Sequence, residues 1–283
     1  MKKIIVIGSS NIDMVVKTSH LPVPGETILG GEFFMNQGGK GANQAVAVKR
    51  LGGNLIFVAK LGNDILGQQS VDYFKKEGID TKYITLDENS ASGANMLLNE
   101  QDVDKVVEEM CEGDILLMQL EIPIQTVEYA ARRAFEKGVK VVLNPAPARS
   151  LPKELLRYLF MITPNRIEAE MLTGIKIVND ADAERVAKEI SAMGVQNIIV
   201  TLGSKGCLVR EGDTSYCVDA FKVEPVDTTA AGDTFNGALC VGLAEGMNLR
   251  QAAVMASKAS SVAVTRMGAQ SSIPHRKELD LNE

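Results

Sequence analysis

Short apolar runs alternate along the chain with longer stretches in which apolar residues recur every three or four positions. The runs predict buried strands, and the periodic stretches predict amphipathic helices, several of which end at a glycine. The strand candidates are residues 3–8, 55–62, 114–121, 139–144, 159–165 and 197–203, and the helix candidates include residues 41–52, 124–138 and 181–194. This alternation predicts a single α/β domain over residues 1–283, in which a mostly parallel central sheet carries helices on both faces.

Two segments depart from this rhythm. Residues 12–36 alternate apolar and polar positions and are rich in proline and glycine, and a second short run lies in residues 81–93. Both segments predict short antiparallel strands outside the main sheet. We therefore expect residues of about 12–36 and 81–97 to form a small β lid.

Composition and charge narrow the class of protein. The chain has 283 residues, of which 45% are hydrophobic and 23% charged, so it can bury a sizeable core. Its net charge is −6 and it has no basic block, which argues against nucleic acid and anionic membranes as partners. No apolar run has the length of a membrane span, and the N-terminal segment becomes polar too soon for a signal peptide. The four cysteines form no CxxC pair, so we expect reduced thiols in a cytoplasmic protein.

Polar residues follow several of the predicted strands. In sheets of this kind, ligands bind beyond the carboxyl ends of the strands, so these residues are candidate ligand contacts. They are Asn11, Asp13, Glu121, Asn144, Asn165, Glu168 and the turn at residues 201–206. Some have a structural alternative: Glu121 ends a buried strand, and Asn165 with Glu168 matches the capping arrangement that begins many helices.

One acid, Asp233, stands among small residues in the stretch DTTAAGDTFNGAL, residues 227–239. An apolar helix is predicted over residues 234–246, and its N-terminus would offer free N–H groups and a partial positive charge, which suit a phosphate. An acid beside such an anion site can accept a hydroxyl proton while the site holds a phosphoryl group. The alternative is an acid that only stabilises the first helical turn. Because a helix N-terminus favours the anion, we expect Asp233 to be a weak base.

A second glycine cluster, NQGGKGANQAVA, covers residues 36–47. It differs from a P-loop because a glycine, rather than serine or threonine, follows Lys40. We interpret it as a cradle for a polyol, in which the paired glycines permit close approach and Lys40 and Asn43 project donors. Asn11 and Asp13 would supply matching acceptors for sugar hydroxyls. A glycine-rich helix start without a ligand is the alternative.

Four stretches, in this order, resemble the signatures of the ribokinase-like, or PfkB, carbohydrate kinases: GGKGAN, TPNRIE, TLGSKG and DTTAAGD. The resemblance extends from Ile5 to about Pro274, and it implies an ATP-dependent sugar kinase that uses Mg²⁺ and a monovalent cation, K⁺. GSSNIDMVV, LPVPGET and RMGAQSSIP are most similar to the members that convert D-ribose to D-ribose 5-phosphate. Fructose, deoxyribose or a nucleoside such as adenosine stay open as acceptors, as does sugar binding without catalysis. Family lids pair two subunits, so a homodimer is expected.

The resemblance also implies a role for individual residues. Asp233 would be the catalytic base, beside an anion hole built from Ala230, Ala231 and Gly232. The sugar would contact Asn11, Asp13, Gly39, Lys40, Asn43, Glu121 and Asp233. The nucleotide phosphates and Mg²⁺ would lie near Asn165 and Glu168, and the nucleotide would be bordered by Thr201, Gly203, Ser204, Gly206, Gly232 and Ser257. The K⁺ ion would be held, mostly through carbonyl oxygens, by Asp227, Thr229, Ala263, Arg266, Gly268 and Ser272.

The sequence differs from the family pattern in two places. Ala230 stands where the family usually has glycine, which is a mild change. The segment around residues 87–104 is shorter than in the family, with the deficit near residues 90–95. Either the lid is truncated or a stretch of the protein is missing from this sequence, and the match at both ends favours the second explanation. A lid that is truly short would bring sugar affinity and dimerisation into question.

Overall fold

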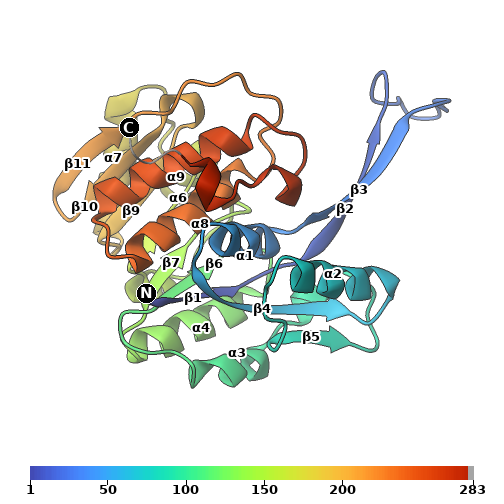
Figure 1. The fold of residues 1–283 in the computed structure, drawn as a ribbon. Helices are drawn as coiled ribbons and strands as arrows, with labels where there is room; N and C mark the ends of the chain where they lie inside the picture. Colours follow the sequence, from blue (N-terminus) through green and yellow to red (C-terminus); the bar gives the residue numbers. More distant parts are fainter. Residues whose placement is uncertain (280–283) are drawn as a thin grey trace.

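The computed structural model describes residues 1–279, and its main feature is a nine-stranded sheet with the strand order β11-β10-β9-β8-β7-β6-β1-β4-β5 (Figure 1). The strands are β1 (Lys3–Ile7), β4 (Asn54–Gly62), β5 (Ile84–Asp87), β6 (Ile115–Met118), β7 (Lys140–Leu143), β8 (Met161–Ile162), β9 (Asn197–Thr201), β10 (Cys207–Glu211) and β11 (Thr214–Val218). Every neighbouring pair from β9 to β5 is parallel, whereas β10 is antiparallel to both β9 and β11. The predicted, mostly parallel sheet is therefore confirmed.

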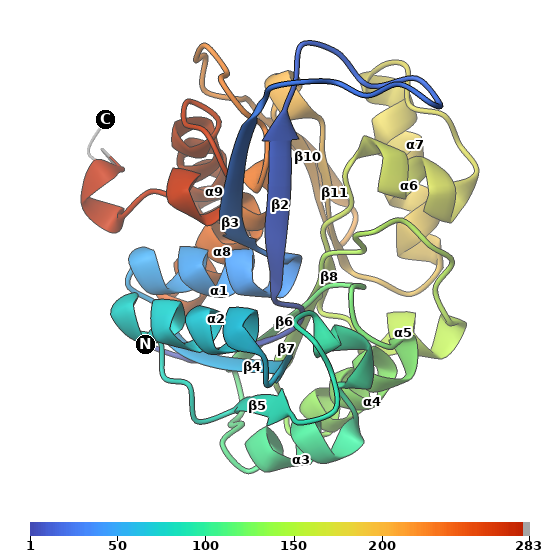
Figure 2. The same cartoon turned by 90° about the vertical axis from the view of Figure 1, so that its right-hand side faces the viewer.

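Helices cover both faces of the sheet, because successive side chains of a strand point to opposite faces. In β1, Ile4 and Val6 belong to one buried apolar cluster, and Ile5 and Ile7 belong to the other. The first cluster includes residues of α1 (Lys40–Arg50), α2 (Ile65–Lys76), α8 (Ala231–Ala244) and α9 (Leu249–Ala263). The second includes residues of α3 (Glu100–Val107), α4 (Ile124–Glu136), α5 (Lys153–Tyr158), α6 (Arg166–Thr173) and α7 (Asp180–Ala192), and Figure 2 shows the two groups of helices.

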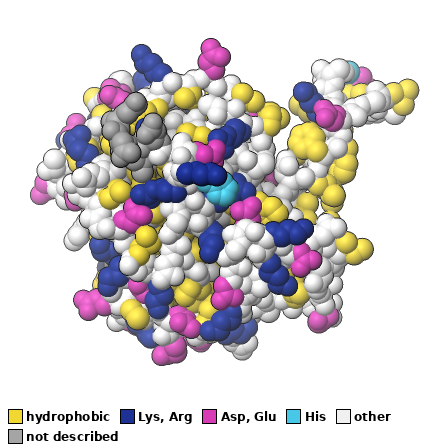
Figure 3. Space-filling view, viewed as in Figure 1, with side chains coloured by type: hydrophobic (Ala, Val, Ile, Leu, Met, Phe, Trp, Pro, Cys, Tyr) yellow, Lys and Arg dark blue, Asp and Glu magenta, His cyan; other side chains and the backbone are white. Residues whose placement is uncertain are grey.

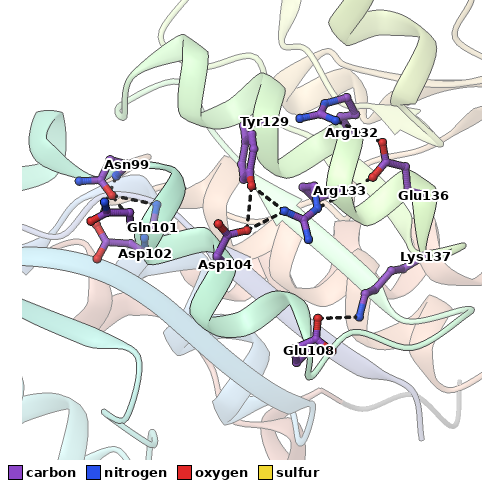
Figure 4. Close-up of polar contacts among 10 residues, drawn as sticks. All are labelled: Asn99, Gln101, Asp102, Asp104, Glu108, Tyr129, Arg132, Arg133, Glu136 and Lys137. Atoms are coloured by element: carbon purple, nitrogen blue, oxygen red, sulfur yellow. Dashed lines mark hydrogen bonds and ion pairs between the residues drawn. The ribbon is translucent and has the colours of Figure 1, made fainter.

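On the second face, side chains link α3 to α4 at the surface (Figure 4). Asp104 on α3 accepts hydrogen bonds from Tyr129 Oη (2.8 Å) and from Arg133 (2.7 Å) on α4. The N-cap of α3 is Asn99, whose side-chain oxygen accepts from the N–H of Asp102 (3.3 Å). These contacts fix the position of α3, which lies in the connection between the edge strand β5 and the central strand β6.

A two-stranded antiparallel sheet, formed by β2 (Asn11–Lys17) and β3 (Glu32–Gly38), projects from the body of the molecule (Figure 1). The antiparallel pairing predicted for residues 12–36 is thus confirmed. Asp13 lies opposite Asn36 in the register of this hairpin. The base of the hairpin, where β2 starts and β3 ends, lies next to the carboxyl end of β1.

Residues 81–97 do not join the hairpin, so the prediction of a second antiparallel lid segment there is wrong. Ile84–Asp87 forms β5, which extends the central sheet parallel to β4. Ile84 and Leu86 pack against the core of the sheet, and this burial explains why the segment adds to the edge. Ala94–Leu97 forms a short 3₁₀ helix, η1, that lies against β4.

The connection between β5 and η1 crosses closely over the end of β4. A Cβ atom placed on Gly62 would lie 2.2 Å from the carbonyl carbon of Ala91, so only glycine fits there. Asp64, the N-cap of α2, accepts hydrogen bonds from the N–H (2.8 Å) and the hydroxyl (2.6 Å) of Ser92. The connection is therefore attached to the main body of the molecule.

The N-terminus of α1 rests directly on the chain that leaves β1. A Cβ on Gly41 would lie 2.5 Å from the carbonyl carbon of Gly8, and Gly39 has a φ of 86°, which favours glycine. This contact brings the glycine cluster to the carboxyl end of β1. The chain adds β4 and β5 on one side of β1 and then β6 on the other, so the order of the strands reverses beside β1, and a crevice is expected there.

Two predicted boundaries shift. The strand predicted over residues 159–165 contains only Met161–Ile162, since α5 ends at Tyr158 and Pro164 cannot donate to a ladder. The helix predicted over residues 234–246 begins three residues earlier, at Ala231, which places Asp233 in its first turn. Among residues 1–279, no helix is both long and apolar enough to cross a membrane.

Candidate active site

Two adjoining cavities open at the carboxyl edge of the sheet. The first, of about 410 Å³, is lined mainly by polar side chains and by small residues. It brings together fourteen of the predicted site residues: Asn11, Asp13, Gly39, Lys40, Asn43, Glu121, Asn165, Glu168, Thr201, Thr229, Ala230, Ala231, Gly232 and Asp233. Residues from both ends of the chain thus meet in one polar space.

The second cavity, of about 430 Å³, is more apolar. It contains the predicted Thr201, Gly203, Ser204, Gly206, Gly232 and Ser257, together with Phe221, Val223, Phe235 and Val264. Thr201, Thr228, Ala231 and Gly232 line both cavities. The start of α8 is therefore the wall between a polar compartment and an apolar one.

Asp233 is a buried acid in the first turn of α8, between the two cavities. Its side chain is held by two amides of α1: Asn43 Nδ2 donates to Oδ2 (2.8 Å), and Gln44 Nε2 donates to Oδ1 (3.0 Å). Burial raises the pKa of Asp233, although Lys40 and the two amides act in the opposite direction. Desolvation thus outweighs the stabilisation of the anion by its donors, and the pKa is raised, whereas the expectation of a weak base had implied a lowered pKa.

The backbone at the start of α8 presents free N–H groups. Ala230, the N-cap, has a φ of 59° and is the one non-glycine residue with a positive φ in the described part of the chain. The Ala231 N–H donates to Thr228 O (3.2 Å), so this group of the predicted anion hole is already engaged. Within residues 1–279, the N–H groups of Ala230, Gly232 and Asp233 make no hydrogen bond. Free N–H donors at the positive end of a helix dipole are the features that suit an anion.

Glu121 and Asn11 belong to the opposite, hairpin side of the first cavity. Glu121 Oε2 accepts hydrogen bonds from Ser9 Oγ (2.5 Å) and from the N–H of Lys40 (2.9 Å). Asn11 was expected to offer an acceptor, but its Oδ1 already accepts from Asn95 Nδ2 (2.6 Å). Burial and, to a smaller extent, the charge of Glu121 raise the pKa of Asp13, so these two acids of the cavity influence each other.

Asn165 and Glu168 form a capping box at the start of α6, as the structural alternative predicted. The Glu168 N–H donates to Asn165 Oδ1 (2.9 Å), and the Asn165 N–H donates to Glu168 Oε2 (2.8 Å). Both residues also line the first cavity. Burial raises the pKa of Glu168, with Lys40 acting against it and Asp233 adding to it. Capping therefore does not remove Glu168 from the site.

Most residues of the predicted cation site lie outside both cavities. Asp227 accepts hydrogen bonds from the N–H (2.9 Å) and hydroxyl (2.7 Å) of Thr229 and from the N–H of Gly268 (2.9 Å). It thereby joins the loop before α8 to the segment after α9. Ala263 is the last residue of α9, Arg266 and Ser272 lie in the segment after it, and none of the three lines either cavity. Thr229 alone of this set reaches the first cavity.

The comparison with known proteins decides the family. The profile of the pfkB family of carbohydrate kinases matches residues 1–114 and 91–276. The chain belongs to this family. It is 42% identical to a ribokinase of Haemophilus influenzae, covering 98% of this chain and 97% of that protein. It is 37% identical to a ribokinase of Bacillus subtilis, covering 99% of both.

Solved structures of family members confirm the predicted fold. The ribokinase of Thermotoga maritima has a TM-score of 0.88 at 36% identity, over 99% of this chain and 98% of that one. The Arabidopsis thaliana ribokinase complexed with ribose and ATP has a TM-score of 0.89 at 28% identity, over 98% and 97%. The predicted family, fold and enzyme class therefore all stand.

Three polar residues that the family signatures did not assign, Asn144, Thr163 and Asn236, also line the first cavity, and hydrogen bonds connect them with Gln44. Gln44 Nε2 also donates to Asn144 Oδ1 (3.1 Å), and Asn144 Nδ2 donates to Thr163 O (3.2 Å). Thr163 Oγ1 in turn donates to Asn236 Oδ1 (2.6 Å). Only Asn144 was among the candidates, on its place after a strand. The other three lie inside or beside quoted motifs, and this adjacency was the available signal.

The comparison also bears on the segment around residues 87–104, which is expected to be shorter than in the family. The family profile matches the chain in two pieces, which overlap at residues 91–114, and not in one continuous match. The alignment with the Haemophilus protein spans 296 positions, whereas this chain has 283 residues. Relatives therefore carry residues that this chain lacks. The explanation by a missing stretch stays a prediction, and an intact mass of 30.5 kDa would contradict it.

Proposed function

We propose that this protein is an ATP-dependent kinase that phosphorylates the 5-hydroxyl of D-ribose to give D-ribose 5-phosphate. The observation that carries the proposal is the position of Asp233, a buried acid at the wall between a polar and an apolar cavity, beside free N–H groups. A sugar suits the polar side and an adenine the apolar side. The relatives named ribokinase, at 42% and 37% identity, support ribose as the acceptor.

Asp233 is proposed to accept the proton of the attacking hydroxyl. A raised pKa improves its driving force as a base at neutral pH. The hydroxyl oxygen attacks the γ-phosphorus of ATP, the bond to the bridging oxygen breaks, and ADP leaves. The N–H groups of Ala230 and Gly232 are placed to bind phosphoryl oxygens as negative charge redistributes. The proton stays on Asp233 until the product departs.

The sugar is proposed to lie between the hairpin base and α1. Asn11, Asp13, Gly39, Lys40, Asn43 and Glu121 line the polar cavity there. Glu121 has one carboxylate oxygen engaged with Ser9 and Lys40, and its Oε1 is open to a hydroxyl. Carboxylates and amides are the groups that proteins use to bind vicinal hydroxyls.

The nucleotide is proposed to occupy the second cavity, between the 201–206 turn and α9, where Ser257 lies. Mg²⁺ is proposed to bind next to Asn165 and Glu168, because both line the polar cavity and hard oxygen ligands suit this ion. Bound Mg²⁺ would neutralise phosphate charge. The chain's own part is to present Glu168 in a fixed orientation through the capping box.

A monovalent cation, K⁺, is proposed to bind where Asp227 joins the two loops. In the described part of the chain, the carbonyl oxygens of Thr229, Arg266 and Gly268 accept no hydrogen bond, so they are available as ligands. Ala263 and Ser272 flank the same segment, but the Ala263 carbonyl accepts from the Arg266 N–H (3.1 Å) and is a weaker candidate. A cation there would hold the loop that leads into the anion site.

We also propose a homodimer that forms through the hairpin. Met14 pairs with Met35 and Val16 with Phe33 across the two strands, and these four side chains are between 49% and 59% exposed. Figure 3 shows hydrophobic side chains along the projecting hairpin. An exposed apolar sheet face of this kind is typical of an interaction surface. The cytoplasm is the proposed location, since ATP is available there.

ADP release in the presence of Mg-ATP tests the function. D-ribose, 2-deoxyribose, D-fructose and adenosine are compared, each with K⁺ and with a large organic cation in its place. We expect ribose-dependent turnover that K⁺ increases. Turnover with another acceptor alone would keep the reaction class and replace the substrate. Absence of turnover with every acceptor would contradict the kinase proposal and favour a sugar-binding protein.

A further inference from the structure

Asn95 is a buried polar residue to which none of the family signatures assigns a role. It lies in η1, at the end of the connection that follows β5, and is only 6% exposed. Its side chain reaches the chain segment that links β1 to the hairpin. Asn95 Oδ1 accepts from the Ser10 N–H (2.9 Å), and Asn95 Nδ2 donates to Asn11 Oδ1 (2.6 Å).

The orientation of these two amides follows from one backbone group. The Ser10 N–H can only donate, so the atom of Asn95 that faces it must be the oxygen. The Asn95 nitrogen then faces Asn11 and can only donate. The Asn11 atom that it meets must therefore be Oδ1. One fixed N–H thus determines the orientation of both side chains.

Asn11 is left with its Nδ2 group for the cavity. Asn11 lines the polar cavity, and within residues 1–279 its Nδ2 donates to no other residue. Asp13 follows two residues later in the same strand, and its carboxylate can act as an acceptor for the same ligand. One hydroxyl could then accept from Asn11 while it donates to Asp13.

We propose that Asn95 is a positioning residue that fixes Asn11 as a hydrogen-bond donor to the sugar. The inference rests on the proposed function, because it names the bound sugar as the partner of Asn11. Without Asn95, Asn11 is free to turn its amide oxygen toward Asp13 and the sugar, where two acceptors would face the same hydroxyl. Sugar binding is expected to weaken, while the chemical step at Asp233 is unaffected.

The Asn95→Asp variant tests this role with almost no change in the shape of the side chain. The carboxylate still accepts from the Ser10 N–H, but it cannot donate, so Asn11 must turn its Nδ2 group inward and its oxygen toward the sugar. We expect the KM for D-ribose to rise about tenfold or more, with kcat within threefold and the KM for ATP unchanged. Asn99→Asp is the matched control, since Asn99 is an N-cap on the same segment that aspartate also suits (Figure 4).

A double-mutant cycle separates positioning from a general structural effect. In an Asn11→Ala background the Asn11 amide is absent, so Asn95→Asp cannot change its orientation. The second substitution should then change the ribose KM by less than twofold. A wild-type KM in the single variant, or an undiminished effect in the Asn11→Ala background, would overturn the inference. If the wild-type protein does not turn over ribose, the proposed function fails separately, and the same cycle is then measured with the acceptor it does use.

Discussion

Asp233, the proposed base, is buried, and burial opposes its charge. The carboxylate is 5% exposed and accepts two amide hydrogen bonds from α1, yet its pKa is raised. A raised folded-state pKa contributes stability that is present below the unfolded pKa and is lost as pH rises through the folded value. The ionised form that the proposed base requires is therefore the form that the fold tolerates less well.

Asp233→Asn should abolish turnover and stabilise the protein at neutral pH. Loss of the general base is expected to lower kcat by a factor of about 10²–10⁴. The asparagine cannot ionise, so the variant keeps the stability that the wild type loses with rising pH. Asn43 Oδ1 is buried without a partner and can accept from the new amide once Asn43 flips. Thermal unfolding at about pH 5 and about pH 8 should show the gain in Tm at the higher value.

Asp227→Asn is the control with the opposite sign. Desolvation raises the pKa of Asp227, but hydrogen bonds from Thr229 and Gly268 outweigh it and the net pKa is lowered. A lowered folded-state pKa gives stability that is present above the unfolded pKa and lost as pH falls. This variant should therefore have a lower Tm than the wild type near pH 7. A lower Tm at about pH 8 in Asp233→Asn as well would contradict the account of Asp233.

The location of the site residues could be predicted from the sequence, but the electrostatics of Asp233 could not. An acid among small residues at a helix start marks an anion site within one short stretch. Its pKa depends on burial and on Asn43, which lies 190 positions away in the sequence. Asn95 escaped prediction for a similar reason, since its contact with Asn11 spans 84 positions.

At the scale of elements, a buried ion pair holds the connection that follows β5. Lys60 on β4 contacts Asp102 on α3 (2.7 Å) and donates to Leu97 O in η1 (3.2 Å). The side chains of Lys60 and Asp102 are 10% and 5% exposed. Desolvation raises the pKa of Asp102, but Lys60 and its other partners outweigh this, so the net pKa is lowered. Three elements thus depend on one pair of charges.

Lys60→Met should destabilise the protein by about 3–5 kcal/mol, because it leaves the buried Asp102 carboxylate with a single charged partner, which is exposed. That partner is Lys105, whose side chain is 53% exposed. Lys105→Met is the matched control and should cost about 1 kcal/mol or less. Urea unfolding of the three proteins measures both differences. Equal destabilisation by the two substitutions would show that burial of Lys60 does not determine the strength of the pair.

At the scale of the whole molecule, the sheet was predictable and its antiparallel edge was not. The central strands are continuous apolar runs, as in β6 (ILLM), because helices bury both of their faces. β10 and β11 contain charged or exposed positions, such as Arg210 and Cys217, so neither strand forms a continuous apolar run that would predict it. β5 was misplaced because four residues carry too little pattern to distinguish a lid strand from a sheet edge.

The two roles proposed for the hairpin, sugar binding and dimerisation, use residues of one small sheet. Asn11 and Asp13 line the polar cavity, while Met14 and Phe33 belong to the exposed apolar face. A partner subunit that covers this face would also restrict movement of the hairpin, and with it the placement of the two sugar contacts. Dimerisation is therefore expected to strengthen sugar binding.

Phe33→Lys should separate the subunits and raise the KM for D-ribose, because a charge at this face is expensive to desolvate. Phe135→Lys is the control: Phe135 lies on α4 and is 54% exposed, close to the 57% of Phe33. Sedimentation should give two 30.5 kDa chains per particle for the wild type and the control, and one for Phe33→Lys. A monomeric wild type would contradict the dimer. A monomeric Phe33→Lys with an unchanged ribose KM would keep the dimer and contradict its link to sugar binding.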